Sequence, residues 1–184
     1  SLVEAPRRLS TESHSANIQK VVSTMLFKPM VLWISLTIIV FGLLGLYSFW
    51  LLQKYWELQD IPVTWFGYLW ATHCVIRGIV AQHAHEVEAA LGWQKVFMLS
   101  AALPILSLFG MGIFSGWFGI TFALGLIVCR GLSTVVFYDA LNSRVNGDFR
   151  ATINSMVSLG TRSLFIVTGP LLGFGVDTLG VNST

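Results

Sequence analysis

The chain contains 184 residues, of which 54% are hydrophobic and only 11% are charged, and its formal net charge is +2. Soluble domains average about 25% charged residues, so this chain has too little charge to cover an ordinary core with a solvated surface. The composition therefore excludes a soluble globular domain and favours a membrane protein. The small net charge gives no indication of a nucleic-acid partner.

Residues 1–28 differ from the rest of the chain. They are polar up to Ala16, after which Ile18, Val21 and Met25 recur at helical spacing. We expect a cytoplasmic linker followed by a short amphipathic helix on the membrane surface, with an unstructured linker as the alternative. The segment has no apolar signal region and no initiator Met, which leads us to expect a fragment of a longer protein.

The remainder, 29–184, is predicted to be one transmembrane domain. A helix needs about 20 apolar residues to cross the hydrocarbon core of a bilayer. Five apolar runs meet this requirement, and they predict an all-α, polytopic helical membrane protein with five membrane-spanning helices. The predicted spans are 29–52, 62–82, 95–115, 117–141 and 152–176.

The basic residues between these runs predict the orientation. Cytoplasmic loops are enriched in Lys and Arg, so the face that carries most of them is predicted to be cytoplasmic. The N-terminus is then cytoplasmic and the last residues are external, where Asn182 begins a glycosylation pattern. One face carries Arg7, Arg8, Lys20, Lys28, Lys95, Arg144 and Arg150, and the other carries Lys54.

The second predicted span carries a polar face. Trp70, His73 and Arg77 follow one another at steps of three and four residues, which places them on one side of a helix. A charge within the bilayer costs roughly 2.5 to 3.5 kcal/mol on insertion scales, so it tends to face protein or water. These side chains are candidates for a transport pathway, through anion binding or a proton relay. Alternatively, Arg77 pairs with a neighbouring helix and fixes the packing of the bundle.

Two further arginines lie within predicted spans. Arg130 shares a face of the fourth span with Thr134, and both are candidates for the same pathway. Arg162 lies halfway along the fifth span and has no obvious partner nearby in the sequence. Its role is either structural or in the pathway.

Small residues and proline mark possible packing and bending positions. The pairs Gly112 with Gly116 and Gly169 with Gly173 have the spacing that lets membrane helices approach closely. Pro170 removes a backbone hydrogen bond and should bend the fifth span. Gly169, Pro170 and Gly173 are therefore structural or pathway candidates.

The sequence gives little support for an enzyme. His83, His85, Glu86 and Glu88 lie together in the predicted 83–95 loop, but the zinc-protease spacing fails because position 89 is alanine. A solvated loop is the better interpretation than a metal site. We expect no enzymatic activity, no metal and no cofactor.

The ordered set of loop and helix residues resembles the C-terminal half of the major facilitator superfamily of transporters. The segment 142–180 is similar to the region of the tenth and eleventh helices of that family, and 47–67 to the connection between the seventh and eighth. Glu4-Ala5-Pro6 resembles the start of its central cytoplasmic loop. The residues that carry the likeness are Trp50, Gln53, Tyr55, Ile61, Pro62, Gly67, Arg150, Ala151, Thr152, Ser155, Gly169, Pro170, Gly173, Asp177 and Gly180.

The resemblance implies that the chain holds helices seven to eleven of a twelve-helix transporter, a partial six-helix half. Its partners would be the lipid bilayer, a small-molecule substrate and the N-terminal half of the same transporter. The implied activity is secondary active transport of a small organic solute across the cytoplasmic (plasma) membrane, with proton-coupled export as one form of it. The alternative is a non-transporting membrane scaffold or sensor with the same fold.

Overall fold

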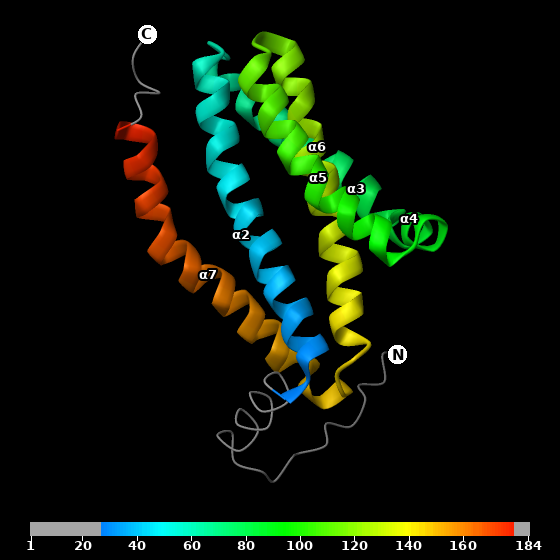
Figure 1. The fold of residues 1–184 in the computed structure, drawn as a ribbon. Coiled ribbons are helices and arrows are strands. Elements are labelled where there is room, and N and C mark those ends of the chain that lie inside the picture. Colours follow the sequence, from blue (N-terminus) through cyan, green and yellow to red (C-terminus); the bar gives the residue numbers. More distant parts are fainter. Residues whose placement is uncertain (1–26, 179–184) are drawn as a thin grey trace, which may run out of the picture.

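A computed structural model describes residues 27–178, which fold into a bundle of α-helices without a strand in that range (Figure 1). Residues 1–26 of the predicted linker and the glycosylation pattern at Asn182 lie outside the described residues. The helical elements are α2 (Pro29–Leu58), the 3-10 turn η1 (Val63–Trp65), α3 (Phe66–Gln82), α4 (Ala84–Leu91), α5 (Trp93–Ile113), α6 (Gly116–Asn142) and α7 (Gly147–Thr178).

Four helices, α2, α5, α6 and α7, are long and apolar enough to cross a membrane. The second expected span corresponds to α3, which has 17 residues and is preceded by the separate turn η1, so it is shorter than the other four. Pro62 ends the preceding extended segment, and η1 and α3 together cover the expected range. The 83–95 segment, expected to be a loop, contains the short helix α4.

Two glycines allow the tight connections of the bundle. Gly92 has φ +82° between α4 and α5, and Gly116 has φ +65° at the start of α6. These positive φ values are costly for residues with a Cβ, so glycine lets the chain reverse direction here. The backbone N–H of Gly116 also donates to the side-chain oxygen of Gln59, which fixes the end of α2 beside the start of α6.

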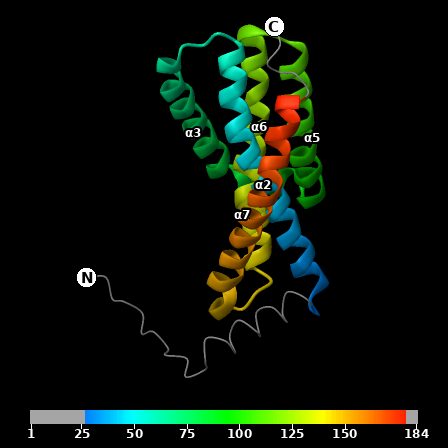
Figure 2. The same ribbon diagram turned by 90° about the vertical axis from the view of Figure 1, so that its left-hand side faces the viewer.

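Helix α6 is the centre of the bundle. It packs against α2, α3, α4 and α5, whereas α7 packs mainly against α2. Figure 2 shows α3 and α5 on opposite sides of the α2–α6 pair. In Figure 1, α4 lies beside the middle of α6, well short of its C-terminal end, because α3 and α5 are shorter than α2 and α6.

The buried apolar side chains form two clusters along α6. One lies toward the start of α6, where Leu126 packs with Leu52 and Trp56 of α2. The other lies toward its end, from Leu132 to Leu141, and includes side chains of α2 and α7. The stretch of α6 between Leu126 and Leu132 therefore lies between the two clusters.

Helix α5 carries Pro104 in its interior, and α6 compensates for it. Proline has no N–H, so the carbonyl of Ser100 loses its partner within the helix. The thiol of Cys129 on α6 donates to this carbonyl at 3.1 Å. A buried acceptor is thereby satisfied across the α5–α6 interface.

Candidate functional site

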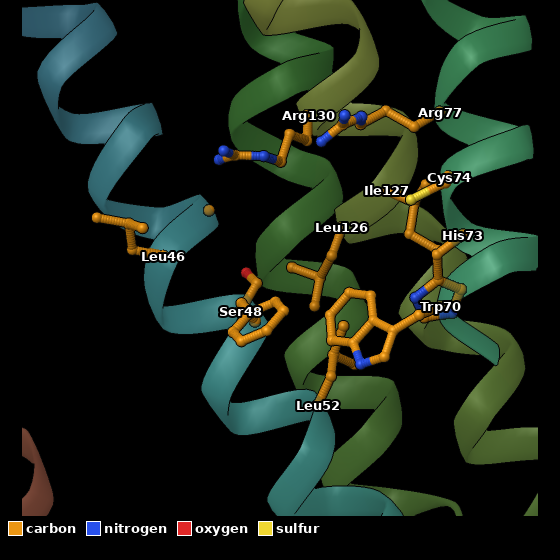
Figure 3. Close-up of a pocket in the computed structure, with 12 residues that line it drawn as sticks. Leu46, Ser48, Leu52, Trp70, His73, Cys74, Arg77, Leu126, Ile127 and Arg130 are labelled. Atoms are coloured by element: carbon orange, nitrogen blue, oxygen red, sulfur yellow. The ribbon is translucent and has the colours of Figure 1, made fainter. Parts of the chain in front are cut away.

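A cavity of about 190 Å³ lies between α2, α3 and α6, at the level where the two apolar clusters separate. Figure 3 shows the side chains of α3 and α6 that enter it. Its polar lining is formed by Trp70, His73, Cys74 and Arg77 of α3, Ser48 of α2 and Arg130 of α6. The rest of the lining is mainly aliphatic and aromatic.

The α3 wall of the cavity carries the three polar side chains that share a helix face. Trp70, His73 and Arg77 all border the same space, and Arg77 points toward Arg130 (Figure 3). Arg77 lies five residues before the end of α3, which corresponds to about 8 Å along the helix. Arg77 is therefore near the α4 end of its own helix but level with Arg130, which lies near the middle of α6 (Figure 3).

Arg130 reaches the cavity from near the midpoint of α6. Its guanidinium lies against α2 at Gly45, where an added Cβ would be 1.3 Å from Nη1. Any side chain at position 45 would occupy this space. The Arg130 guanidinium can lie here because residue 45 is glycine. The sequence analysis missed Gly45, and no periodic pattern in α2 identifies it, because its role depends on which helix packs opposite.

Thr134 lies one turn beyond Arg130 but outside this cavity. Its hydroxyl donates to the Arg130 carbonyl at 2.7 Å, which is a bond within α6. It borders a smaller cavity of about 130 Å³ on the other side of Arg130, together with Ser133 and Tyr138. Arg130 therefore contributes to two cavities, and Thr134 to the smaller one.

Neither cavity arginine forms an ion pair within residues 27–178. The ion pairs of that region join Lys54 to Glu57 near the end of α2 and His85 to Glu88 within α4. No carboxylate of the described residues borders the cavity that contains Arg77 and Arg130. The alternative in which Arg77 pairs with an acidic side chain of a neighbouring helix thus has no partner in the described part of the chain.

Aromatic rings of α2 pack against Trp70 and His73, in the first half of α3. Trp70 stacks on Phe49 of α2 with ring centroids 4.6 Å apart, and Trp56 lies 5.4 Å from His73 and 5.3 Å from Trp70. His73 is only 6% exposed. The His73 Nδ1 and Trp70 Nε1 atoms are buried and have no hydrogen-bond partner. Buried polar atoms are normally satisfied, so these two have unused hydrogen-bonding capacity.

The arginine of α7 lies elsewhere. Arg162 is exposed and borders an open groove of about 450 Å³ with Tyr138 of α6 and with Asn154 and Ser158 of its own helix. It does not line the cavity that contains Arg77 and Arg130. The structure thus separates the three arginines into a pair and a single residue.

Gly169, Pro170 and Gly173 line a second groove, of about 590 Å³, between α2 and α7. An added Cβ at Gly173 would meet nothing within 4 Å, and one at Gly169 would meet only Phe165 of the same helix. These residues therefore do not form a close helix contact within the described residues. Gly112 and Gly116 also face open space.

The histidines of the α4 region do not converge. His83 Nδ1 lies 2.9 Å from the Ile79 carbonyl, and His85 pairs with Glu88 at 3.7 Å. Within the described residues, no group of three or more His, Cys, Asp or Glu side chains could hold a metal ion.

Comparison of the chain with protein-family models, with curated proteins and with solved structures gives no match. The class of protein follows from the fold alone. Helices α2, α5, α6 and α7 have the length and hydropathy of membrane spans, and the described residues contain helices without strands. The chain is an all-α, polytopic integral membrane protein.

Proposed function

We propose that the chain forms part of a secondary active transporter for a small organic solute, and that the cavity between α2, α3 and α6 lies on the transport pathway. The observation that carries this proposal is that Arg77 and Arg130 line one cavity without a carboxylate partner among residues 27–178. Ionisable residues within membrane spans are costly, and those that persist commonly mark a substrate or ion pathway.

The position of the cavity along the helices supports the same function. Arg130 lies about 20 Å from either end of α6, and Gly45 lies near the middle of α2. Transporters place their substrate sites near the bilayer midplane, between helices that move relative to one another. The cavity is bounded by three different helices, so a movement of α3 against α2 and α6 would change its access.

The partners and the driving force follow from the same proposal. The resemblance to major facilitator transporters implies a second helical bundle, the N-terminal half, against which this chain would move. His73 lines the cavity, and imidazole is the side chain that most readily exchanges a proton under physiological conditions, so His73 is the candidate for coupling transport to protons. The distribution of basic loop residues favours the cytoplasmic side of the plasma membrane for α4 and the α6–α7 connection.

The test is substitution of Arg77 by alanine in the full-length protein reconstituted in liposomes. We expect solute uptake to be lost while the thermal unfolding temperature in detergent stays unchanged, because Arg77 makes no ion pair with a described residue. The matched control is Arg144→Gln, which removes a guanidinium just beyond the end of α6, far from the cavity.

Two outcomes would contradict the proposal. Normal uptake by Arg77→Ala would remove the cavity from the pathway. Failure of the unaltered protein to move any member of a panel of anionic, neutral and cationic solutes would favour a scaffold or sensor.

A further inference from the structure

We infer that the solute held in this cavity is a small organic anion, with a carboxylate or phosphate group between Arg77 and Arg130 and an apolar body against the neighbouring side chains. The inference deepens the proposed function, because it names the substrate class of the same site. The binding step itself does not depend on transport, so the two can fail separately.

The first argument is charge. Arg77 and Arg130 enter one cavity from α3 and α6 (Figure 3), and each brings a positively charged guanidinium group. Arg77 is exposed and Arg130 is half-buried, so the two like charges repel each other across the cavity, and no acidic side chain among the described residues lines it. The nearest acid along α6 is Asp139, nine residues from Arg130 and exposed near the helix end. An anionic ligand would supply the missing opposite charge.

The second argument is that the cavity offers hydrogen-bond donors rather than acceptors. Each guanidinium has five N–H donors and no acceptor, and an indole nitrogen only donates. Trp70 Nε1 is unpartnered, as is His73 Nδ1, which donates in one tautomer and in the charged ring. Ser48 already donates its hydroxyl proton to the Leu44 carbonyl at 2.7 Å. The cavity is therefore rich in donors, which matches the oxygens of a carboxylate or phosphate.

The third argument is the shape and polarity of the remaining wall. Leu46, Phe49 and Leu52 of α2 and Leu126 and Ile127 of α6 contribute apolar side chains to the lining. An inorganic ion would leave this apolar surface without a partner. With a volume of about 190 Å³, the cavity suits a compact ligand that carries one anionic group and an apolar body.

The test uses benzoate and its neutral isostere benzamide as probes. The full-length protein is titrated with each by calorimetry, in detergent and in phosphatidylcholine nanodiscs. We expect saturable benzoate binding and affinity for benzamide at least about tenfold weaker, because a charge-assisted contact to a guanidinium is lost. Arg77→Gln and Arg130→Gln should each weaken benzoate binding about tenfold, Arg77→Lys should restore part of it, and Arg144→Gln should leave it unchanged.

Equal affinity for benzoate and benzamide, or unchanged benzoate affinity in both glutamine variants, would overturn the inference. If a glutamine variant does not fold, Gly45→Ala serves instead, because a methyl group there displaces the Arg130 guanidinium. Loss of benzoate binding when phosphatidylglycerol replaces part of the phosphatidylcholine would assign the site to a lipid headgroup, which also overturns it.

The solute panel separates this inference from the proposed function. Benzoate binding that depends on both arginines, without movement of any solute in liposomes, would leave the anion site standing and refute transport. Transport of a neutral or cationic solute that benzoate does not inhibit would support transport and refute the anion site.

Discussion

The position of the Arg130 side chain depends on the lack of a side chain at Gly45, on the neighbouring helix α2. Its Nη1 atom lies 1.3 Å from where the Cβ of a residue larger than glycine would be at position 45. The atom in the way is the end of a flexible side chain, so a methyl group at Gly45 would move the guanidinium and leave the α2 and α6 backbones in place. Gly45 therefore controls the geometry of the cavity more than the stability of the bundle.

This predicts the effect of Gly45→Ala. We expect benzoate affinity to fall about tenfold, with a thermal unfolding temperature close to that of the unaltered protein, because the guanidinium alone is displaced. Calorimetry and thermal unfolding in detergent measure the two quantities. Gly78→Ala is the control, since this glycine is also helical, adjoins Arg77 and has nothing within 4 Å of an added Cβ. A large fall in unfolding temperature for Gly45→Ala alone would contradict the argument.

Helix α6 makes its close contacts through glycines that no short motif identified. An added Cβ at Gly125 would lie 2.2 Å from the Ser107 hydroxyl of α5, and one at Gly131 would lie 2.8 Å from Val80 of α3. The Gly112 and Gly116 pair has the expected spacing but faces open space. Spacing alone shows that two glycines share a helix face, and the partner helix decides whether that face is used.

Gly131→Ala should therefore destabilise the α3–α6 contact. The new methyl would also lie 3.2 Å from the Arg77 backbone carbonyl, which cannot rotate away as a side-chain end can. Overpacking of this kind typically costs about 1 to 3 kcal/mol. We expect a lower thermal unfolding temperature in detergent, while Gly112→Ala on α5 leaves it unchanged. Equal unfolding temperatures for the two variants would contradict this prediction, because they would show that α3 can shift away from the new methyl group without loss of stability.

At the scale of the whole molecule, α7 is the least enclosed helix. It contacts α2 where Thr161 packs on Gly42 and where the hydroxyls of Tyr47 and Thr168 form a hydrogen bond. Beyond these contacts, α7 and α2 diverge (Figure 1), and the groove that contains Gly169 and Pro170 opens between them. In the proposed transporter, α7 and the helices that pack around α6 are the parts that a transport movement would rearrange.

The orientation of this bundle can be tested with two matched serine positions. Ser115 and Ser143 flank opposite ends of α6, and both are exposed. In a background with Cys74 and Cys129 replaced by serine, a membrane-impermeant maleimide should label Ser115→Cys in intact cells. We expect Ser143→Cys to react only after the cytoplasmic face is opened to the reagent, because the positive-inside rule predicts that the basic loops lie on that side. Labelling of both positions from one side would contradict a membrane-spanning α6.

The sequence by itself determined the class of protein and which residues share one face of a helix. Apolar runs of about 20 residues require a bilayer, and steps of three and four residues place Trp70, His73 and Arg77 on one face, because both properties depend only on local helix geometry. The 17-residue length of α3 and the helix within 83–95 were missed, since apolar runs do not show where a 3-10 turn or a short helix interrupts the chain. Only the tertiary structure brought Arg130 to Gly45 and Arg77, and separated Arg162 from both. The relative rotation and height of packed helices arise from side-chain fit between segments distant in sequence, which no pattern within a single helix contains.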